Sequence, residues 1–269
     1  MSLSAATGFF LYRKTFGTHL FFLITGIFLL AAGSLVLNQY SEREQDAIMA
    51  RTMKRPIAAK KISPGLAILV ILFLLFSGIF LLLLNGFIPF ALACLGVILY
   101  NVFYTSLKKI TLLAIIPGAF VGAIPPLIGY TSAGGTVLND KILFFSAFMF
   151  LWQIPHFWLL LIRYGKEYKT AGFRTISDHL NEKQIKYLIF FWVLLSLVCL
   201  NLFSRFTGLL TKSFSILLII LNISFVIFFF SLLFIRKGSN HQRNAFILFN
   251  SFSILIMLLL IAESLFSGI

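Results

Sequence analysis

NQYSEREQDAIMARTMKRPIAAKKISP, residues 38–64, is a long polar stretch in a chain that is otherwise almost continuously apolar. The whole sequence has eight acidic residues, and three of them, Glu42, Glu44 and Asp46, lie within five positions here. Asn38, Glu42 and Asp46 are spaced four residues apart, so they share one face if the preceding helix continues through them. The same stretch carries six basic residues. It therefore combines oxygen ligands with cationic groups.

The order of residue types in this stretch suits a complex of magnesium with a polyphosphate. The amide and carboxylate oxygens of Asn38, Glu42 and Asp46 are ligands that Mg²⁺ prefers. Arg51 and Arg55 follow, and guanidinium groups bind phosphate oxygens bidentately. The alternative is a solvated loop whose positive charge only sets the membrane topology.

The rest of the chain has the composition of a polytopic membrane protein. It has 269 residues, 60% of them hydrophobic, and apolar runs near the length of a bilayer-spanning helix recur with short polar gaps. The net charge of +14 does not indicate nucleic-acid binding, because no soluble domain with a basic face is present. We therefore expect membrane lipid, and not nucleic acid, to surround the protein.

Eight runs are predicted to span the membrane as helices, over residues 18–37, 65–84, 87–107, 112–130, 142–162, 187–203, 213–235 and 245–262. Residues 1–11 are also apolar but would extend only about 16 Å as a helix, roughly half of the hydrocarbon core. They either lie in the interface or form the second half of a first helix whose beginning is missing. The second interpretation is favoured because a charged amine inside the bilayer is costly. The prediction is an all-α bundle of about nine transmembrane helices, forming one membrane-embedded domain over residues 1–269.

Basic residues are distributed unevenly between the two ends of these spans. Of the 22 lysine and arginine residues, 17 lie in loops 38–64, 108–111, 163–186 and 236–244, and five lie at the opposite end. Lys and Arg collect in cytoplasmic loops, so the long loops are expected in the cytoplasm. Two of these loops also hold six of the eight acids, which topology alone does not require.

A second group of polar residues lies within and after the span 142–162. An imidazole at the depth of His156 usually faces a cavity or a partner helix, although a packing histidine bonded to a neighbouring carbonyl is the alternative. Glu167 follows three turns later and shares its face if Pro155 and Gly165 do not break the helix. We expect an acid at the rim and an imidazole deeper on one wall.

Two further features lie near this end. Tyr104 lies near the end of the span 87–107, and Lys108, just after this span, is either a phosphate contact or a snorkelling anchor. Residues 117–130 are rich in Gly, Ala and Pro, which either allow close helix packing or leave room for a large flat ligand.

Five motifs occur together along the chain: N-Q-Y-x-E-x-x-x-D-x-x-M-x-R-T-x-x-R-P (38–56), P-G-A-x-x-G-A-x-P-P-L-I-G (117–129), L-W-Q-x-P-H-F-W (151–158), E-Y-x-x-A-G (167–172) and R-N-A-F-x-L-F-N-S (243–251). This combination resembles the intramembrane, UbiA-type aromatic prenyltransferases and, within that superfamily, the protoheme IX farnesyltransferase family. The chain departs from that family at Glu167, where an aspartate is usual, and at residues 173–176, where the family commonly has a Pro-Met-Leu-Pro-like run.

The resemblance implies nine helices around a central cavity that the acid-bearing loops cap. It implies transfer of a farnesyl group from farnesyl diphosphate to a vinyl carbon of haem b, giving haem O, in the inner membrane of a bacterium. The expected catalytic residues are Asp46, Arg51, Arg55 and His156. The expected Mg²⁺ ligands are Asn38, Glu42, Asp46 and Glu167. The expected substrate-binding residues are Asn38, Glu42, Lys54, Tyr104, Lys108, Glu167 and Tyr168.

Two other functions are compatible with the sequence. A prenyltransferase with the same donor site could act on a quinone precursor or another aromatic acceptor. A non-enzymatic transporter would need charged groups along a pathway near the midplane, whereas the acids here cluster at one rim. For the haem enzyme, haem A synthase or oxidase-assembly proteins are the candidate partners.

Overall fold

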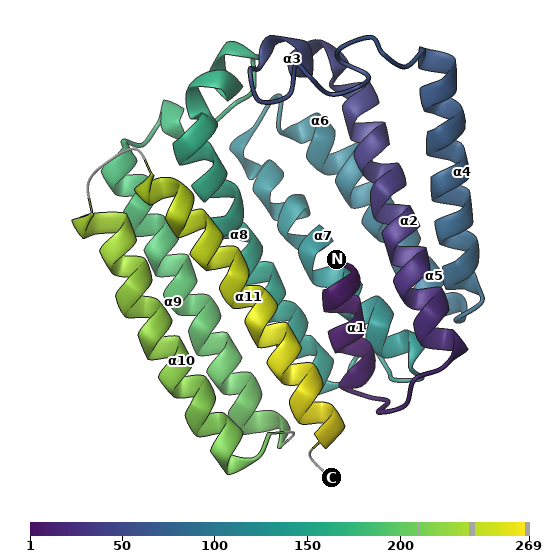
Figure 1. The fold of residues 1–269 in the computed structure, drawn as a ribbon, viewed down its shortest axis with the longest axis vertical. Coiled ribbons are helices and arrows are strands. Elements are labelled where there is room, and N and C mark those ends of the chain that lie inside the picture. Colours follow the sequence, from purple (N-terminus) through teal and green to yellow (C-terminus); the bar gives the residue numbers. More distant parts are fainter. Residues whose placement is uncertain (209, 237–239, 267–269) are drawn as a thin grey trace.

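The computed structural model describes residues 1–208, 210–236 and 240–266, and all regular secondary structure in these ranges is helical. Eight helices there are long and apolar enough to cross a membrane. They pack side by side in one bundle (Figure 1), which confirms the prediction of an all-α polytopic fold. The spans are α2 (Thr18–Ser41), α4 (Pro64–Leu83), α5 (Phe87–Val97) with its extensions η1 (Ile98–Tyr104) and α6 (Thr105–Leu107), η2 (Leu112–Ala114) with α7 (Ile115–Ser132), α8 (Asp140–Thr170), α9 (Glu182–Thr207), α10 (Lys212–Phe230) with η4 (Ser231–Ile235), and α11 (His241–Phe266).

Several helices are longer than the spans predicted from hydropathy. α8 continues for 31 residues, well past the predicted end at Ile162. Neither Pro155 nor Gly165 interrupts it. The extension follows because Lys, Glu and Arg favour helix as strongly as most apolar residues do, so helices continue outside the hydrocarbon layer. His156 and Glu167 consequently lie on one continuous helix, as expected.

The short helix α1 (Ser2–Phe10) packs among α2, α7 and α11. Its Thr7 and Phe9 side chains are buried, and Figure 1 shows the N-terminal end in the middle of the bundle. α1 therefore occupies a place within the bundle and does not lie along the membrane interface, which was one of the two alternatives for residues 1–11.

α1 and α7 approach each other too closely for a β-carbon at their crossing. A β-carbon on Gly129 would collide with the carbonyl oxygen of Ala5, and one on Gly8 would collide with the carbonyl oxygen of Pro126. Glycines of the segment 117–130 therefore serve close packing.

The helices divide into two groups, each with its own apolar core. One core is formed by the four helices α8, α9, α10 and α11. In it, Trp152 stacks on Phe249 at 4.0 Å and Phe225 on Phe252 at 4.1 Å. The other joins α1, α2, α4, α5 and α7. Because α2 belongs to one group and α8 to the other, residues at their ends meet where the two groups adjoin.

The two acid-bearing loops lie at the same end of the bundle. The short helix α3 (Arg43–Ile48) crosses this end above α2, and the end of α8 rises beside it (Figure 1). This arrangement was expected from the distribution of charge. Lys237, one of the basic residues counted for topology, lies outside the described residues.

The α1–α7 crossing leads to a stability prediction. Gly129→Ala should lower the free energy of unfolding by about 1–3 kcal/mol, because the added methyl group meets backbone that cannot move aside. Unfolding of the detergent-purified protein by heat or SDS measures this. Gly65→Ala, at an open position on α4, is the matched control and should change stability little. Equal stability of both variants would contradict the close crossing.

Candidate functional site

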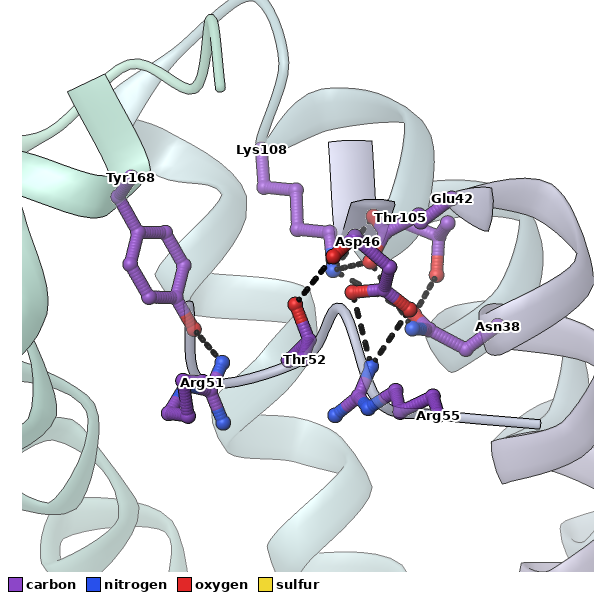
Figure 2. Close-up of polar contacts among 9 residues, drawn as sticks. All are labelled: Asn38, Glu42, Asp46, Arg51, Thr52, Arg55, Thr105, Lys108 and Tyr168. Carbon is purple, nitrogen blue, oxygen red and sulfur yellow. Dashed lines mark hydrogen bonds and ion pairs between the residues drawn. The ribbon is translucent and has the colours of Figure 1, made fainter. Parts of the chain in front are cut away.

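The polar stretch of residues 38–64 bends soon after it leaves α2. The helix does not continue unbroken through this stretch, since α2 ends at Ser41 and Glu42 has ψ 16°. The break is small, because the backbone N–H of Asp46 still donates to the carbonyl of Glu42 at 2.7 Å. Asn38, Glu42 and Asp46 remain together (Figure 2) and are only 6%, 3% and 1% exposed. We call these three residues the acid cluster.

Glu42 is paired with a cation from another segment. The ammonium of Lys108, just after α6, lies 2.6 Å from Oε1 and 2.7 Å from Oε2 of Glu42. The amide of Asn38 donates to Oε2 at 2.9 Å, whereas Oε1 is buried without a hydrogen bond. The contact of the ammonium with Oε1 is an ion pair without a hydrogen bond, because it is short but not oriented as a hydrogen bond. Burial lowers the pKa of Lys108, and the Glu42 carboxylate opposes that shift.

Asn38 is bound by a threonine that the sequence did not single out. The hydroxyl of Thr105 lies 3.1 Å from Oδ1 of Asn38 and 2.9 Å from the carbonyl of Tyr100. The backbone N–H of Thr105 also bonds to Tyr100, which is the i→i+5 bond of the π-helix η1. This wide turn sets the rotation of Thr105 and Lys108 toward α2, and no residue pattern predicted it.

Asp46 is paired with an arginine from the segment after α3. Nη1 of Arg55 donates to Oδ1 at 3.0 Å and to Oδ2 at 2.8 Å. The buried hydroxyl of Thr52 donates to the backbone carbonyl of Asp46 at 3.0 Å. Arg55, expected to bind phosphate, thus binds an acid of the same stretch here.

Arg51 joins the first polar loop to the end of α8. Its backbone N–H donates to Oε2 of Glu167 at 3.1 Å, and its guanidinium donates to the hydroxyl of Tyr168 at 3.0 Å (Figure 2). The guanidinium also lies over the ring of Tyr164 at 5.2 Å. The two loops therefore form one cap.

A capping box orders the loop between α8 and α9, residues 171–181, which we call the second loop. The backbone N–H of Thr175 donates to Asp178 at the end of η3 (Ile176–Asp178), and Lys169 lies 3.1 Å from the same carboxylate. These two contacts lower the pKa of Asp178. The ordered loop places Phe173 near Lys108, with 5.4 Å between the ammonium and the ring. Lys54, by contrast, is exposed, and no hydrogen bond or ion pair joins it to the acid cluster within the described residues.

His156 lies deeper in the bundle and contacts α11. Its Nδ1 is 2.9 Å from Oδ1 of Asn250. The amide nitrogen of Asn250 donates to the carbonyl of Phe246 at 2.7 Å, so its oxygen faces the imidazole. Nδ1 must then carry a proton, and in the neutral imidazole the lone pair is on Nε2. Sequence reasoning missed Asn250, although it lies in the quoted 243–251 motif.

An apolar cavity of about 290 Å³ lies between α2, α5 and α7. On α2, its lining residues Ile27, Ala31 and Ser34 continue the row that Asn38 and Glu42 complete. Tyr100, whose carbonyl contacts Thr105, lines the same cavity. The cavity therefore extends along α2 from beneath the acid cluster.

The donor set of the acid cluster fits magnesium if a ligand completes it. No three His, Cys, Asp or Glu side chains converge on a metal position in the parts of the chain that the structure describes. Mg²⁺ is commonly held by one or two carboxylates together with substrate phosphates and water. Oε1 of Glu42 is an oxygen ligand of the right kind: it accepts no hydrogen bond, and the ammonium of Lys108 lies 2.6 Å from it. Glu167 is engaged by Arg51, and its assignment as a metal ligand stays a prediction.

Comparisons with curated proteins identify relatives of similar sequence. The chain is 36% identical to the protoheme IX farnesyltransferase of Geobacter sulfurreducens over 170 residues, 63% of each protein. It is 33% identical to that of Aquifex aeolicus over 207 residues, 76% of this chain and 70% of the relative. The match thus covers less than two thirds of the Geobacter protein.

Solved structures with the same fold are more distant in sequence. The apo structure of a UbiA homologue from Aeropyrum pernix K1 matches with a TM-score of 0.81 and 15% identity, covering 100% of this chain and 97% of that one. A UbiA homologue from Archaeoglobus fulgidus bound to GPP and Mg²⁺ matches with a TM-score of 0.75 and 16% identity, covering 98% and 93%. The fold is therefore shared along the whole bundle.

The comparison with protein families covers the same bundle. The profile of the UbiA prenyltransferase family matches residues 1–256, which includes the acid cluster, the cap and the helices that line the apolar cavity. On this evidence the chain belongs to the UbiA prenyltransferase family.

Proposed function

We propose that this protein, as one domain over residues 1–269, transfers a farnesyl group from farnesyl diphosphate to a vinyl carbon of haem b, giving haem O and diphosphate. The observation that carries the proposal is the junction of the acid cluster with the apolar cavity along α2. A ligand with an anionic head and a hydrocarbon tail fits such a site. The GPP and Mg²⁺ bound by the Archaeoglobus homologue support the donor, and the protoheme IX farnesyltransferase relatives support the acceptor.

The first role of the site is to stabilise the leaving diphosphate. Magnesium bound by Asn38, Glu42 and Asp46 would supply positive charge to the diphosphate oxygens. Three cations lie at the same end of the bundle, near the acid cluster: Arg51, Arg55 and Lys108. Arginine forms paired hydrogen bonds to phosphate. Charge stabilisation of this kind lowers the barrier to ionisation of an allylic diphosphate.

The second role is to protect the allylic cation. The apolar cavity excludes water from the farnesyl chain, which keeps the cation from hydrolysis. Tyr100 and Tyr104 stack 5.6 Å apart between the cavity and the cap, and aromatic faces stabilise positive charge.

A second cavity supports a flat, apolar acceptor that carries carboxylates. It has a volume of about 300 Å³ and shares Tyr104 and Lys108 with the cap. Phe157 and Phe173 line it, and Arg174 lies at its wall as a cation for propionate. His156 does not line this cavity and contacts Asn250 of α11 instead. In its neutral form, Nε2 is the imidazole atom that would bind an electrophilic centre such as haem iron.

The proposal is tested by incubating membranes with haem b, farnesyl diphosphate and Mg²⁺ and detecting farnesylated porphyrin by mass spectrometry. Asp46→Asn should lower the rate by at least about a hundredfold, because one charge of the metal site is lost. Glu44→Gln is the matched control, since Glu44 is an exposed acid of the same stretch. Wild-type membranes that farnesylate a quinone precursor but no haem would refute the acceptor, and full activity of Asp46→Asn would remove Asp46 from the site.

The cavity predicts the length of the prenyl donor. Ala31→Phe should fill the middle of the cavity and lower the use of farnesyl diphosphate relative to geranyl diphosphate by at least about tenfold. Competition between the two donors with product analysis measures this ratio. Phe28→Leu, a lipid-facing change on the same helix, should leave the ratio unchanged. An unchanged ratio in Ala31→Phe would place the tail elsewhere.

We infer that the cap faces the cytoplasm, because its loops carry most of the lysine and arginine residues. In intact bacterial cells, a cysteine at Lys61 should resist a membrane-impermeant maleimide until lysis. A cysteine at Lys212, at the opposite end, should react at once, and the reverse pattern would invert the orientation.

A further inference from the structure

Every oxygen ligand of the acid cluster is already occupied by a donor or cation of the same chain. Lys108 lies against both oxygens of Glu42, Arg55 against both oxygens of Asp46, and Thr105 against Oδ1 of Asn38. These contacts lie where a metal ion would have to bind. Lys108 and Arg55 must therefore leave the carboxylates before a divalent cation can bind there.

The burial of the acids explains why the two cations are present. Glu42 and Asp46 are almost completely buried, and a buried carboxylate that loses its only counter-charge is strongly unfavourable. Lys108 and Arg55 thus stabilise the site when it holds no ligand. For the same reason they compete with any cation that arrives alone.

Lys108 has favourable partners other than Glu42. Its ammonium lies 5.0 Å from the ring of Tyr104 and 5.4 Å from the ring of Phe173 while it contacts Glu42, so these two rings also stabilise its charge. Its long flexible stem allows the ammonium to move between partners. Arg55 is less buried than Asp46 and can turn toward the mouth.

We propose that Lys108 and Arg55 are internal counter-ions that keep divalent metal out of the acid cluster until a diphosphate arrives to receive them. The inference rests on the proposed donor site and is independent of the acceptor. A diphosphate brings negative charge for both cations, so their transfer to it frees Glu42 and Asp46 for metal. Metal and diphosphate then bind with positive coupling, and each raises the affinity for the other by the same factor.

The test measures metal binding directly with Mn²⁺ as the probe. Free Mn²⁺ is followed by electron paramagnetic resonance during titration of the full chain purified in detergent, with and without farnesyl thiodiphosphate. Wild type should bind Mn²⁺ weakly alone and much more tightly with the thiodiphosphate. Lys108→Met should bind Mn²⁺ alone at least about tenfold more tightly than wild type, because the competing charge is gone. The factor by which the thiodiphosphate raises the affinity for Mn²⁺ should be correspondingly smaller in this variant.

Matched variants separate this mechanism from a general loss of charge. Lys109→Met removes the neighbouring lysine, which forms no ion pair with the acid cluster within the described residues, and should bind Mn²⁺ as wild type does. Lys108→Arg keeps the charge and should also bind like wild type. Adding Glu42→Gln to Lys108→Met should abolish the gain, since the new affinity depends on the freed carboxylate.

The outcomes that contradict the proposal are distinct from failure of the haem reaction. Tight binding of Mn²⁺ alone by wild type would overturn it, as would unchanged or weaker binding by a folded Lys108→Met protein. If Lys108→Met does not elute as a folded species on size exclusion, Arg55→Met makes the same test at Asp46. Protein that shows the expected Mn²⁺ pattern but does not farnesylate haem would refute only the acceptor assignment.

Discussion

Two carboxylates buried at the mouth of a membrane bundle are the constraint on which the cap depends. Glu42 and Asp46 are nearly inaccessible to solvent, and acids in that position need counter-charges. Arg55 supplies one from the same polar stretch, and Lys108 supplies the other from the end of α6. The ion pairs therefore fold the first polar loop back over α2 and draw the end of α6 against it. Without these acids, the loop would lack the ion pairs that hold it in one conformation.

The second loop completes the cap through a different set of contacts. Arg51 bonds to Glu167 and Tyr168, and Met49 packs against Phe173 in a small apolar cluster. These contacts connect the two helix groups that otherwise have separate cores. The site is thus built where the groups meet, which gives it access to side chains from both. It also means that a change in the second loop can reach Lys108 through Phe173.

One face of α2 connects the cap to the apolar cavity. Small and apolar residues line the cavity over the middle of this helix, and the polar residues of the acid cluster follow on the same face. One helix therefore positions both ends of an amphipathic ligand in a fixed register. Because the surrounding helices exclude water, charges at the mouth act more strongly on a bound diphosphate than they would in bulk solvent.

The sequence by itself determined the spans, the end that carries the polar loops and the residue types of the acid cluster. Spans and topology follow from the hydropathy and charge of consecutive residues. These properties are local, so they can be predicted without knowing which helices pack against each other. Whether α2 continues through Glu42 was left open by the sequence, and the structure shows a short break there that still keeps the three residues together.

The tertiary structure alone decided which groups meet. Lys108 is 66 residues from Glu42, and Asn250 is 94 residues from His156. No local pattern links such pairs, because they come together only when separate helices pack at a given rotation. The π-helix before Thr105 sets one of those rotations. Helix rotation is determined by the packing of many side chains at once, and so the pairing of acids with cations became visible only in the folded bundle.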